Sequence, residues 1–173
     1  MRKFGKFPSI ATIRSEKEGG GWGLSEQKRF ELFKAILPHV DAIDIELSSK
    51  AILKNSVSAA HDQKKVVCIS FHNFDKTPSY AKLVEILREA KSYGADMVKI
   101  AALALNRQDV QILAEFTIRN KAENIITISM GSEGIVSRVF FPVLGSLLTY
   151  ASLGNATAPG QLDYSSTFDL LRR

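Results

Sequence analysis

Short apolar runs alternate with helical patterns along the chain, at steps of roughly thirty residues, as repeated βα units do. The runs are rich in β-branched residues, and we expect strands at residues 9–13, 42–45, 65–70, 97–102, 124–129 and 148–152. Between them, apolar residues recur at helical spacing, and we expect helices at residues 25–37, 50–61, 78–93, 107–120, 132–146 and 164–172. This alternation predicts a parallel sheet with helices connecting its strands.

Two of the expected helices have clear start or stop signals. Thr77 can cap a helix whose first residue is Pro78, and Gly94 ends that helix. Asn106 can cap the helix at residues 107–120. One apolar face of the first of these helices comprises Leu83, Ile86, Leu87 and Ala90.

Continuous apolar strands imply burial on both faces, which fits either an open doubly wound sheet or a closed (β/α) barrel. Polar residues recur where the expected strands end: Arg14, Asp44, Glu46, His72, Lys99, Ser129 and the loop at 157–161. Functional residues drawn from several strand ends are typical of a barrel, whereas an open sheet uses one switch point. We therefore predict an α/β chain of the (β/α)8 TIM-barrel type, incomplete, with about six βα units. Residues 1–173 are expected to form a single, partial catalytic domain.

The composition is that of a soluble globular protein: 173 residues, of which 45% are hydrophobic and 24% charged. The apolar stretch at residues 139–148 is interrupted by Pro142 and Gly145 and is shorter than the ~20 residues that cross a bilayer. The first residues are basic but lack an apolar signal region. A single cysteine, Cys68, suits a reducing compartment and is expected to pack in the core. We expect a cytoplasmic protein with no membrane partner.

The net charge of +5 could indicate nucleic-acid binding, but Lys and Arg are scattered along the chain. We therefore expect no nucleic-acid partner and a small anionic substrate instead. The three histidines lack the spacing of metal ligands, so no metal site is predicted. The glycine-rich segment at residues 18–23 could form a phosphate nest, but no GK[ST] follows it, and a mobile loop at the mouth of the site is the preferred interpretation.

Two residues look misplaced for packing. Lys99 lies inside an apolar strand, and His72 ends another apolar run one βα unit earlier. Burial of a lysine would lower the pKa of its amine from ~10.4 and make the amine available as a nucleophile. The alternatives are an edge-strand or snorkelling role for Lys99 and a loop-capping role for His72.

Six segments, in order, resemble type I 3-dehydroquinate dehydratase: residues 11–20 (ATIRSEKEGG), 43–47 (IDIEL), 70–78 (SFHNFDKTP), 94–101 (GADMVKIA), 128–138 (ISMGSEGIVSR) and 156–161 (ATAPGQ). They span nearly the whole chain. The resemblance implies a (β/α)8 barrel enzyme of the shikimate pathway, which converts 3-dehydroquinate to 3-dehydroshikimate and water through a lysine Schiff base. It also implies that no cofactor is needed.

The resemblance assigns roles to individual residues. Lys99 matches the lysine that forms the imine with the C3 ketone, and His72 matches the histidine that removes the C2 proton and helps the C1 hydroxyl leave in a syn elimination. Glu18 matches the carboxylate that orients this histidine. A carboxylate partner fixes the tautomer of an imidazole and stabilises its protonated form.

Other residues match the substrate-binding positions of the family. Arg138 matches the arginine that holds the substrate carboxylate, for which a planar guanidinium is well suited. Arg14 and Gln161 match hydroxyl and carboxylate contacts, Thr157 stands where many members have serine, and Glu46 is a further candidate. Alternatively, Arg138 could pair with Glu133, and Asp44 and Glu46 could be structural acids at the strand ends.

The first expected strand corresponds to the third strand of the family, so the part with the family's Glu-x-Arg motif is missing. We expect either a longer natural chain, a truncated remnant, or an oligomer that completes the barrel. A homodimer is the expected assembly, because the open sheet edges would expose backbone and apolar groups. The competing functions are a non-catalytic barrel fragment that acts as an assembly partner and a class I Schiff-base aldolase.

Overall fold

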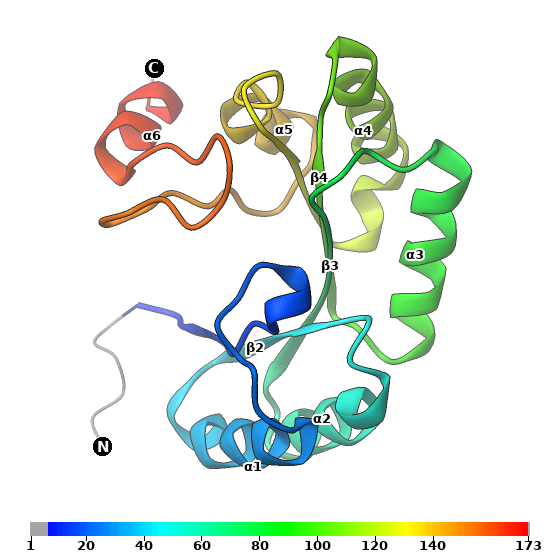
Figure 1. Ribbon diagram of the computed structural model, residues 1–173, viewed down its shortest axis with the longest axis vertical. Helices are drawn as coiled ribbons and strands as arrows, with labels where there is room; N and C mark the ends of the chain where they lie inside the picture. The colour runs from blue at the N-terminus through cyan, green and yellow to red at the C-terminus, as the bar shows by residue number, and fades with distance from the viewer. Residues whose placement is uncertain (1–6, 173) are drawn as a thin grey trace. The chain divides into compact units, whose positions relative to one another are not determined.

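The computed structural model describes residues 7–172, and its strands follow one another in a single sheet (Figure 1). The strands are β1 (Ile10–Thr12), β2 (Ala42–Glu46), β3 (Val66–Asn73), β4 (Met97–Leu103) and β5 (Ile125–Met130). Their order in the sheet is β1-β2-β3-β4-β5, which is also their order along the chain. The β1–β2 and β2–β3 pairs are parallel, as βα units require.

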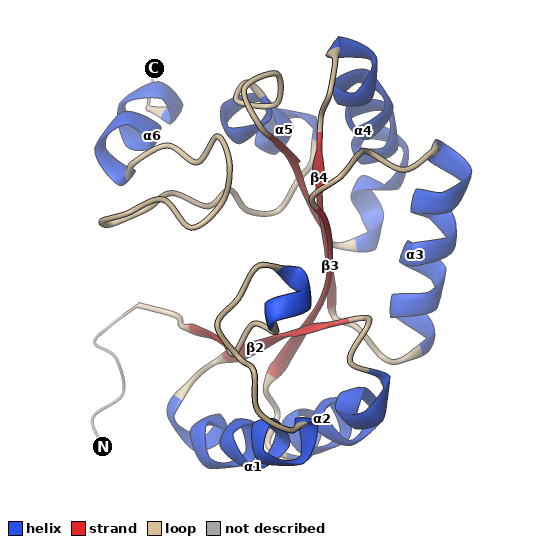
Figure 2. Cartoon of the chain, viewed as in Figure 1, coloured by secondary structure: helices blue, strands red, loops and turns tan. Residues whose placement is uncertain are grey.

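Helices connect the strands (Figure 2). The α-helices are α1 (Glu26–Ile36), α2 (Lys50–Asp62), α3 (Tyr80–Ser92), α4 (Arg107–Asn120), α5 (Ser137–Leu144) and α6 (Tyr164–Leu171). Three short 3-10 helices are η1 (Glu16–Glu18), η2 (Leu37–His39) and η3 (Lys121–Glu123). Within residues 7–172, every helix is too short or too polar to cross a membrane.

The chain forms two compact units. Unit 1 comprises the residues up to Phe71 together with Leu87–Val98, and its helices α1 and α2 pack side by side. β2 is buried along its whole length, with Ile43 and Ile45 inaccessible to solvent. Phe33 from α1 and Leu53 from α2 are equally buried and complete this core. The core holds the C-terminal end of β2 rigidly, and the polar residues of unit 1 gather there.

Unit 2 comprises His72–Ile86 and the residues from Lys99 on, and α4 and α5 pack against β5. A small apolar core joins β4 and β5 through Ala101, Ile128 and Met130, with Leu103, Tyr150 and Ala158 packed against it. The hydroxyl of Ser137 accepts a hydrogen bond from the backbone N–H of Ser129 and donates one to its carbonyl, both at 3.0 Å. This double hydrogen bond fixes the start of α5 beside β5.

The five strands and most helices agree with the expected positions. Helix α4 has the predicted bounds, and the side chain of Asn106 accepts a hydrogen bond from the backbone of Asp109 at 3.1 Å, which confirms the predicted cap. Cys68 is fully buried in β3, as expected. The predicted cap of α3 is wrong: the helix begins at Tyr80, the Ser79 hydroxyl accepts from Lys82 at 3.4 Å, and Thr77 donates instead to the Leu103 carbonyl.

The strand expected at residues 148–152 is absent from the described chain, and Figure 2 shows loop there. Only Ser152 forms a bridge, with Asp163, and its backbone bonds to Leu162 and Tyr164. An apolar run becomes a strand only when a neighbouring strand accepts its hydrogen bonds, and the partner here is a loop.

The helix expected at residues 132–146 is shorter, because α5 begins only at Ser137. Gly131 has a φ of 85°, and the residues after it form tight turns in which Ser137 bonds to the Gly134 carbonyl at 2.9 Å. Hydrogen bonds between residues three apart therefore replace the first turns of the α-helix that the apolar spacing predicts.

Candidate functional site

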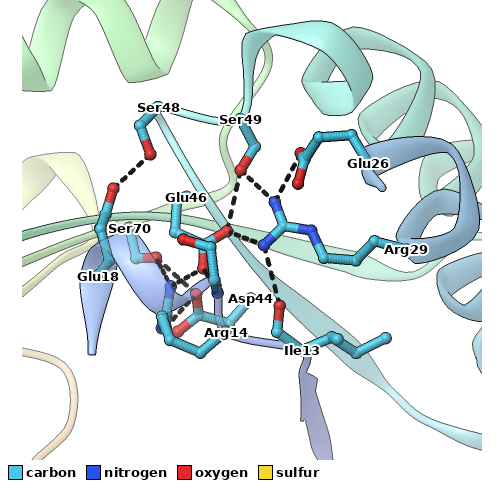
Figure 3. Close-up of polar contacts among 11 residues, drawn as sticks. Ile13, Arg14, Glu18, Glu26, Arg29, Asp44, Glu46, Ser48, Ser49 and Ser70 are labelled. Carbon is cyan, nitrogen blue, oxygen red and sulfur yellow. Dashed lines mark hydrogen bonds and ion pairs between the residues drawn. The ribbon is translucent and has the colours of Figure 1, made fainter. Parts of the chain in front are cut away.

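Arg14 follows β1 and makes the central contacts of a polar group in unit 1 (Figure 3). Its Nη2 lies 2.8 Å from Oδ1 of Asp44, and its Nη1 donates to the Ser70 hydroxyl at 2.7 Å. The Ser70 hydroxyl in turn donates to Asp44 at 2.6 Å. Burial lowers the pKa of Arg14, but the charges of Asp44 and Glu46 outweigh this and leave the pKa raised. Arg14 is therefore a fixed cation, and 13% of its side chain remains exposed.

Glu46, the last residue of β2, is fully buried between two arginines. Its Oε1 lies 3.2 Å from Nη1 of Arg14, and its Oε2 lies 2.9 Å from Nη1 of Arg29. The backbone N–H of Ser15 donates to Oε1 at 2.8 Å. Burial alone would raise the pKa of Glu46, but the Ser15 hydrogen bond and the arginine charges hold it below the usual value. The interpretation of Asp44 and Glu46 as structural acids thus fits this geometry better than substrate contact by Glu46.

Glu18 lies in the glycine-rich segment, in the 3-10 helix η1. Its side chain is 8% exposed, and its Oε1 accepts a hydrogen bond from the Ser48 hydroxyl. The segment folds back on the end of β1: Gly20 bonds to the Ser15 carbonyl at 2.9 Å and Trp22 to the Arg14 carbonyl at 3.0 Å. A Cβ on Gly20 would lie 2.1 Å from the Arg14 carbonyl oxygen, so the close approach requires glycine here. The segment expected to be a mobile loop is therefore closely hydrogen-bonded.

Lys99 lies inside β4 and is 8% exposed. Its neighbours Val98 and Ile100 are buried, while its Nζ lies 4.5 Å from the centre of the Tyr150 ring. Side chains two apart share a face of a strand, so Lys99 lies on the same face as Ala101. β4 has a neighbour on each side in the sheet order, which excludes the edge-strand alternative. Cation–π attraction instead holds the Lys99 ammonium over an aromatic ring.

His72 is the penultimate residue of β3 and is partly exposed. Its ring stacks on Phe74, with the ring centres 6.4 Å apart. Such a ring is supported on one face by an apolar surface and stays accessible, which a proton carrier needs.

Arg138, on the first turn of α5, is 2% exposed. Its Nη2 donates to the Pro159 carbonyl at 3.2 Å, and none of the carboxylates within residues 7–172 pairs with it. The alternative pairing with Glu133 is therefore wrong. Burial lowers the pKa of the Arg138 guanidinium. A buried cation that lacks a counter-charge in the folded chain is expected to bind an anion.

Thr157 and Gln161 face each other in the loop before α6. The Gln161 side-chain oxygen accepts from the Thr157 backbone at 2.7 Å and from its hydroxyl at 3.1 Å. Gly131 bonds to the Pro159 carbonyl at 3.2 Å, so the loop is tied to the end of β5. The same carbonyl binds Arg138, which places Thr157, Gln161 and Arg138 in one part of unit 2.

Two residues of these groups are not among the candidates that the sequence indicates. Arg29 is fully buried on α1, and its spacing of four from Phe33, itself buried, was a usable signal for an inward-facing residue. Tyr150 approaches Lys99 from a loop, and no local pattern predicts that contact.

The fold and the buried lysine together define a partial barrel of the (β/α) class, and comparison with known proteins identifies the family. A sequence profile described as type I 3-dehydroquinase matches residues 1–172. A 3-dehydroquinate dehydratase of Methanococcoides burtonii is 41% identical over 156 residues, covering 90% of this chain and 66% of that protein. One from Methanocaldococcus jannaschii is 38% identical, covering 99% and 79%. The chain belongs to the type I 3-dehydroquinase family.

Solved structures give the same family. The 3-dehydroquinate dehydratase of Geobacillus kaustophilus has a TM-score of 0.92 at 31% sequence identity. The match covers 97% of this chain and 68% of the Geobacillus chain. A type I 3-dehydroquinate dehydratase of Clostridium difficile with covalent modified comenic acid has a TM-score of 0.89 at 35% identity, with coverages of 95% and 68%. The barrel class is thereby confirmed, and the chain spans about two thirds of the length of the Methanococcoides relative.

Proposed function

We propose that the chain catalyses the dehydration of 3-dehydroquinate to 3-dehydroshikimate, a step of the shikimate pathway, as a hydro-lyase. The proposal takes residues 1–173 as one catalytic domain. The observation that carries it is the buried lysine of β4, whose Nζ lies 4.5 Å from the centre of the Tyr150 ring. The ring holds the side chain in place, and once the ammonium gives up its proton, the amine can attack a carbonyl carbon.

The chemistry assigned to Lys99 and His72 balances without a cofactor. The Lys99 amine adds to the C3 ketone and water leaves, which gives an iminium ion. His72 takes the C2 proton, the electrons move into the iminium as an enamine, and they return to expel the C1 hydroxyl, which leaves as water with the proton from His72. Hydrolysis of the imine then releases 3-dehydroshikimate and restores the amine.

Arg138 is the proposed partner of the substrate carboxylate. Its buried guanidinium has a carbonyl partner and no paired carboxylate in the described chain, and a bidentate carboxylate would supply the missing negative charge. Thr157 and Gln161, tied to the same carbonyl by the loop, are proposed as hydroxyl and amide contacts. Arg14 keeps its predicted role as a substrate contact, and Glu18 its predicted role as the carboxylate that assists the base.

We propose that Glu46 supports Arg14 and does not touch the substrate. Its carboxylate is fully buried and already has contacts with Arg14, Arg29 and the Ser15 backbone. A carboxylate in such a position orients its cation and balances its charge.

A homodimer and a cytoplasmic location complete the proposal. On α5, Phe140 and Val143 are 50% and 75% exposed, and Val136, the residue just before the helix, is 53% exposed. Apolar side chains at this spacing lie on one side of a helix and favour association with a second copy. Light scattering of the wild type and of Val143→Glu tests this: a dimer that becomes a monomer supports it, and a monomeric wild type contradicts it.

Reduction by borohydride in the presence of 3-dehydroquinate tests the proposed enzyme. The hydride converts the imine to a stable secondary amine, so the wild-type chain should gain the mass of the reduced ligand on Lys99. Lys99→Ala should gain none, while Lys34→Ala, which removes an exposed lysine of α1, should react like the wild type. A folded wild-type chain that gains no mass contradicts the proposal and favours a non-catalytic fragment.

His72→Ala separates the two steps. The variant should still form the trapped adduct, because the amine of Lys99 is intact, but it should no longer produce the conjugated enone that ultraviolet absorbance detects. If His72→Ala also prevents trapping, the proton-transfer role of His72 is wrong.

A further inference from the structure

Arg29 is a buried cation of unit 1, and both of its terminal nitrogens, Nη1 and Nη2, have partners there (Figure 3). It is 0% exposed on α1, and its Nη1 donates to the Ile13 carbonyl at 3.2 Å. Its Nη2 lies 2.9 Å from Oε2 of Glu26 and also contacts the Ser49 hydroxyl. These contacts, with the pair to Glu46, hold the guanidinium against the ends of both β1 and β2.

Glu46 connects Arg29 to Arg14. Each oxygen of its carboxylate faces one arginine, with Oε1 toward Arg14 at 3.2 Å and Oε2 toward Arg29 at 2.9 Å. Ser49 donates to Oε2 at 3.1 Å, and the Ser15 backbone donates to Oε1. The rotation of the carboxylate is therefore fixed from two sides, and the position of Oε1 beside Arg14 depends on what holds Oε2.

Four charges form the inner part of this group, because Glu26, the further partner of Arg29, lies at the exposed side. Arg14, Arg29, Asp44 and Glu46, called here the ion-pair cluster, contain two cations and two anions. Arg14 is the accessible member: 13% of its side chain is exposed, against 1% for Asp44 and none for Glu46 and Arg29. A guanidinium has five N–H donors, and the contacts with Asp44, Ser70 and Glu46 engage three of them. Arg14 thus keeps donors for a ligand at the exposed edge of the cluster.

We propose that Arg29 is a positioning residue that acts on the substrate through Glu46 and Arg14. This inference rests on the proposed function, in which Arg14 contacts 3-dehydroquinate. Without Arg29, Oε2 of Glu46 loses its cation and the buried cluster carries a net negative charge. Arg14 is then the remaining cation for two carboxylates, so it is drawn inward and its donors turn from the ligand.

A purely structural role for Arg29 makes a different prediction. The loss of a buried ion pair lowers the stability of the fold in either case, so stability does not separate the two roles. Only the positioning role changes the affinity of the folded protein for 3-dehydroquinate, and only that role requires Arg14 for the change.

The test measures the half-saturating concentration of 3-dehydroquinate for borohydride trapping on Lys99. The variants are Arg29→Met, Arg29→Lys and the control Lys34→Met on the same helix, each assayed at a temperature where circular dichroism shows it folded. Arg29→Met should raise the half-saturating concentration about tenfold, which corresponds to the loss of one charged hydrogen bond. Arg29→Lys keeps the charge and should recover most of this loss, and Lys34→Met should match the wild type.

A double-mutant cycle gives the decisive comparison. In an Arg14→Ala background, Arg29→Met should change the half-saturating concentration by less than about twofold. The reason is that Arg29 acts on the ligand only through Arg14, which this background lacks. If Arg29→Met alone leaves the half-saturating concentration unchanged, or if it has the same effect with and without Arg14, the positioning role is wrong.

A measurement without substrate keeps the inference testable if the proposed function fails. With 15N-labelled arginine, the Arg14 guanidinium, assigned by comparison with Arg14→Lys, should give restricted signals in the wild-type chain because Asp44 and Ser70 hold it. These signals should shift or broaden in Arg29→Met, stay close to the wild type in Arg29→Lys, and stay unchanged in Lys34→Met. Unchanged Arg14 signals in Arg29→Met would overturn the proposal whatever the chain does with 3-dehydroquinate.

Discussion

In unit 1 each charge of the ion-pair cluster faces an opposite charge, whereas in unit 2 the buried guanidinium of Arg138 has a backbone carbonyl as its hydrogen-bond partner. Both regions take arginine out of water. The cluster recovers the desolvation cost within the folded chain through Asp44 and Glu46. Arg138 does not, and its lowered pKa reflects that burial. The paired charges of the ion-pair cluster therefore stabilise the fold, whereas the guanidinium of Arg138 is available to bind an anionic ligand.

The largest expected difference is in stability. Arg29→Met removes one partner of a buried ion pair and should lower the free energy of unfolding by about 3 kcal/mol. Arg138→Met removes a buried cation without a carboxylate partner and should leave that free energy unchanged or raise it by about 1 kcal/mol. Urea unfolding of both variants measures this. Equal destabilisation by the two substitutions would contradict the distinction between the two regions.

Acid should weaken the cluster and not the Arg138 region. The pKa of Glu46 is lowered in the folded chain, so its contribution to stability is present above the unfolded value and is lost as pH falls below about 4.3 toward the folded pKa. Arg29→Met removes part of that lowering, so its free energy of unfolding should depend less steeply on pH below this value. Arg138→Met should keep the wild-type acid dependence, because the guanidinium stays charged throughout.

Urea unfolding over this pH range provides the measurement. If the free energy of unfolding falls as steeply with acid in Arg29→Met as in the wild type, the lowered pKa of Glu46 does not depend on Arg29.

Two strand serines differ in the same way, and a smaller effect on stability is expected from each. The Ser70 hydroxyl accepts from Arg14 and donates to Asp44, whereas the buried Ser129 hydroxyl has no hydrogen-bond partner among the described residues. Ser70→Ala should lower the free energy of unfolding by about 1–3 kcal/mol, because Asp44 loses a buried donor. Ser129→Ala should change it by less than about 0.5 kcal/mol. Urea unfolding measures both values. A large decrease in the free energy of unfolding of Ser129→Ala would show that the Ser129 hydroxyl does make a stabilising hydrogen bond.

The positions of β1 to β5 follow from local sequence, because alternating apolar runs and helical spacing report burial directly. The run at 148–152 fails for a non-local reason: its apolar residues are present, but Ser152 pairs with a loop residue, Asp163. The expected start of α5 is wrong because tight turns occupy residues 131–136, and no apolar periodicity indicates such turns.

The candidate residues of the site can be predicted from the sequence, but the side chains that they contact cannot. Lys99 was visible as a charge in an apolar run, and it is buried in β4 as that pattern implies. That Glu46 faces two arginines, that Arg138 faces a carbonyl and that Tyr150 covers Lys99 depend on contacts between segments far apart in the chain. Pattern within one element carries no information on such contacts.

The proposed function requires that unit 2 contain both an imine-forming lysine, Lys99, and an arginine that binds an anion, Arg138. Peptide mass mapping after borohydride reduction with 3-dehydroquinate tests this claim. The expected result is a reduced ligand on the peptide that contains Lys99 in the wild type, at a half-saturating concentration at least about tenfold lower than in Arg138→Met. A folded wild-type chain with no modified Lys99, or equal trapping in Arg138→Met, would contradict the claim.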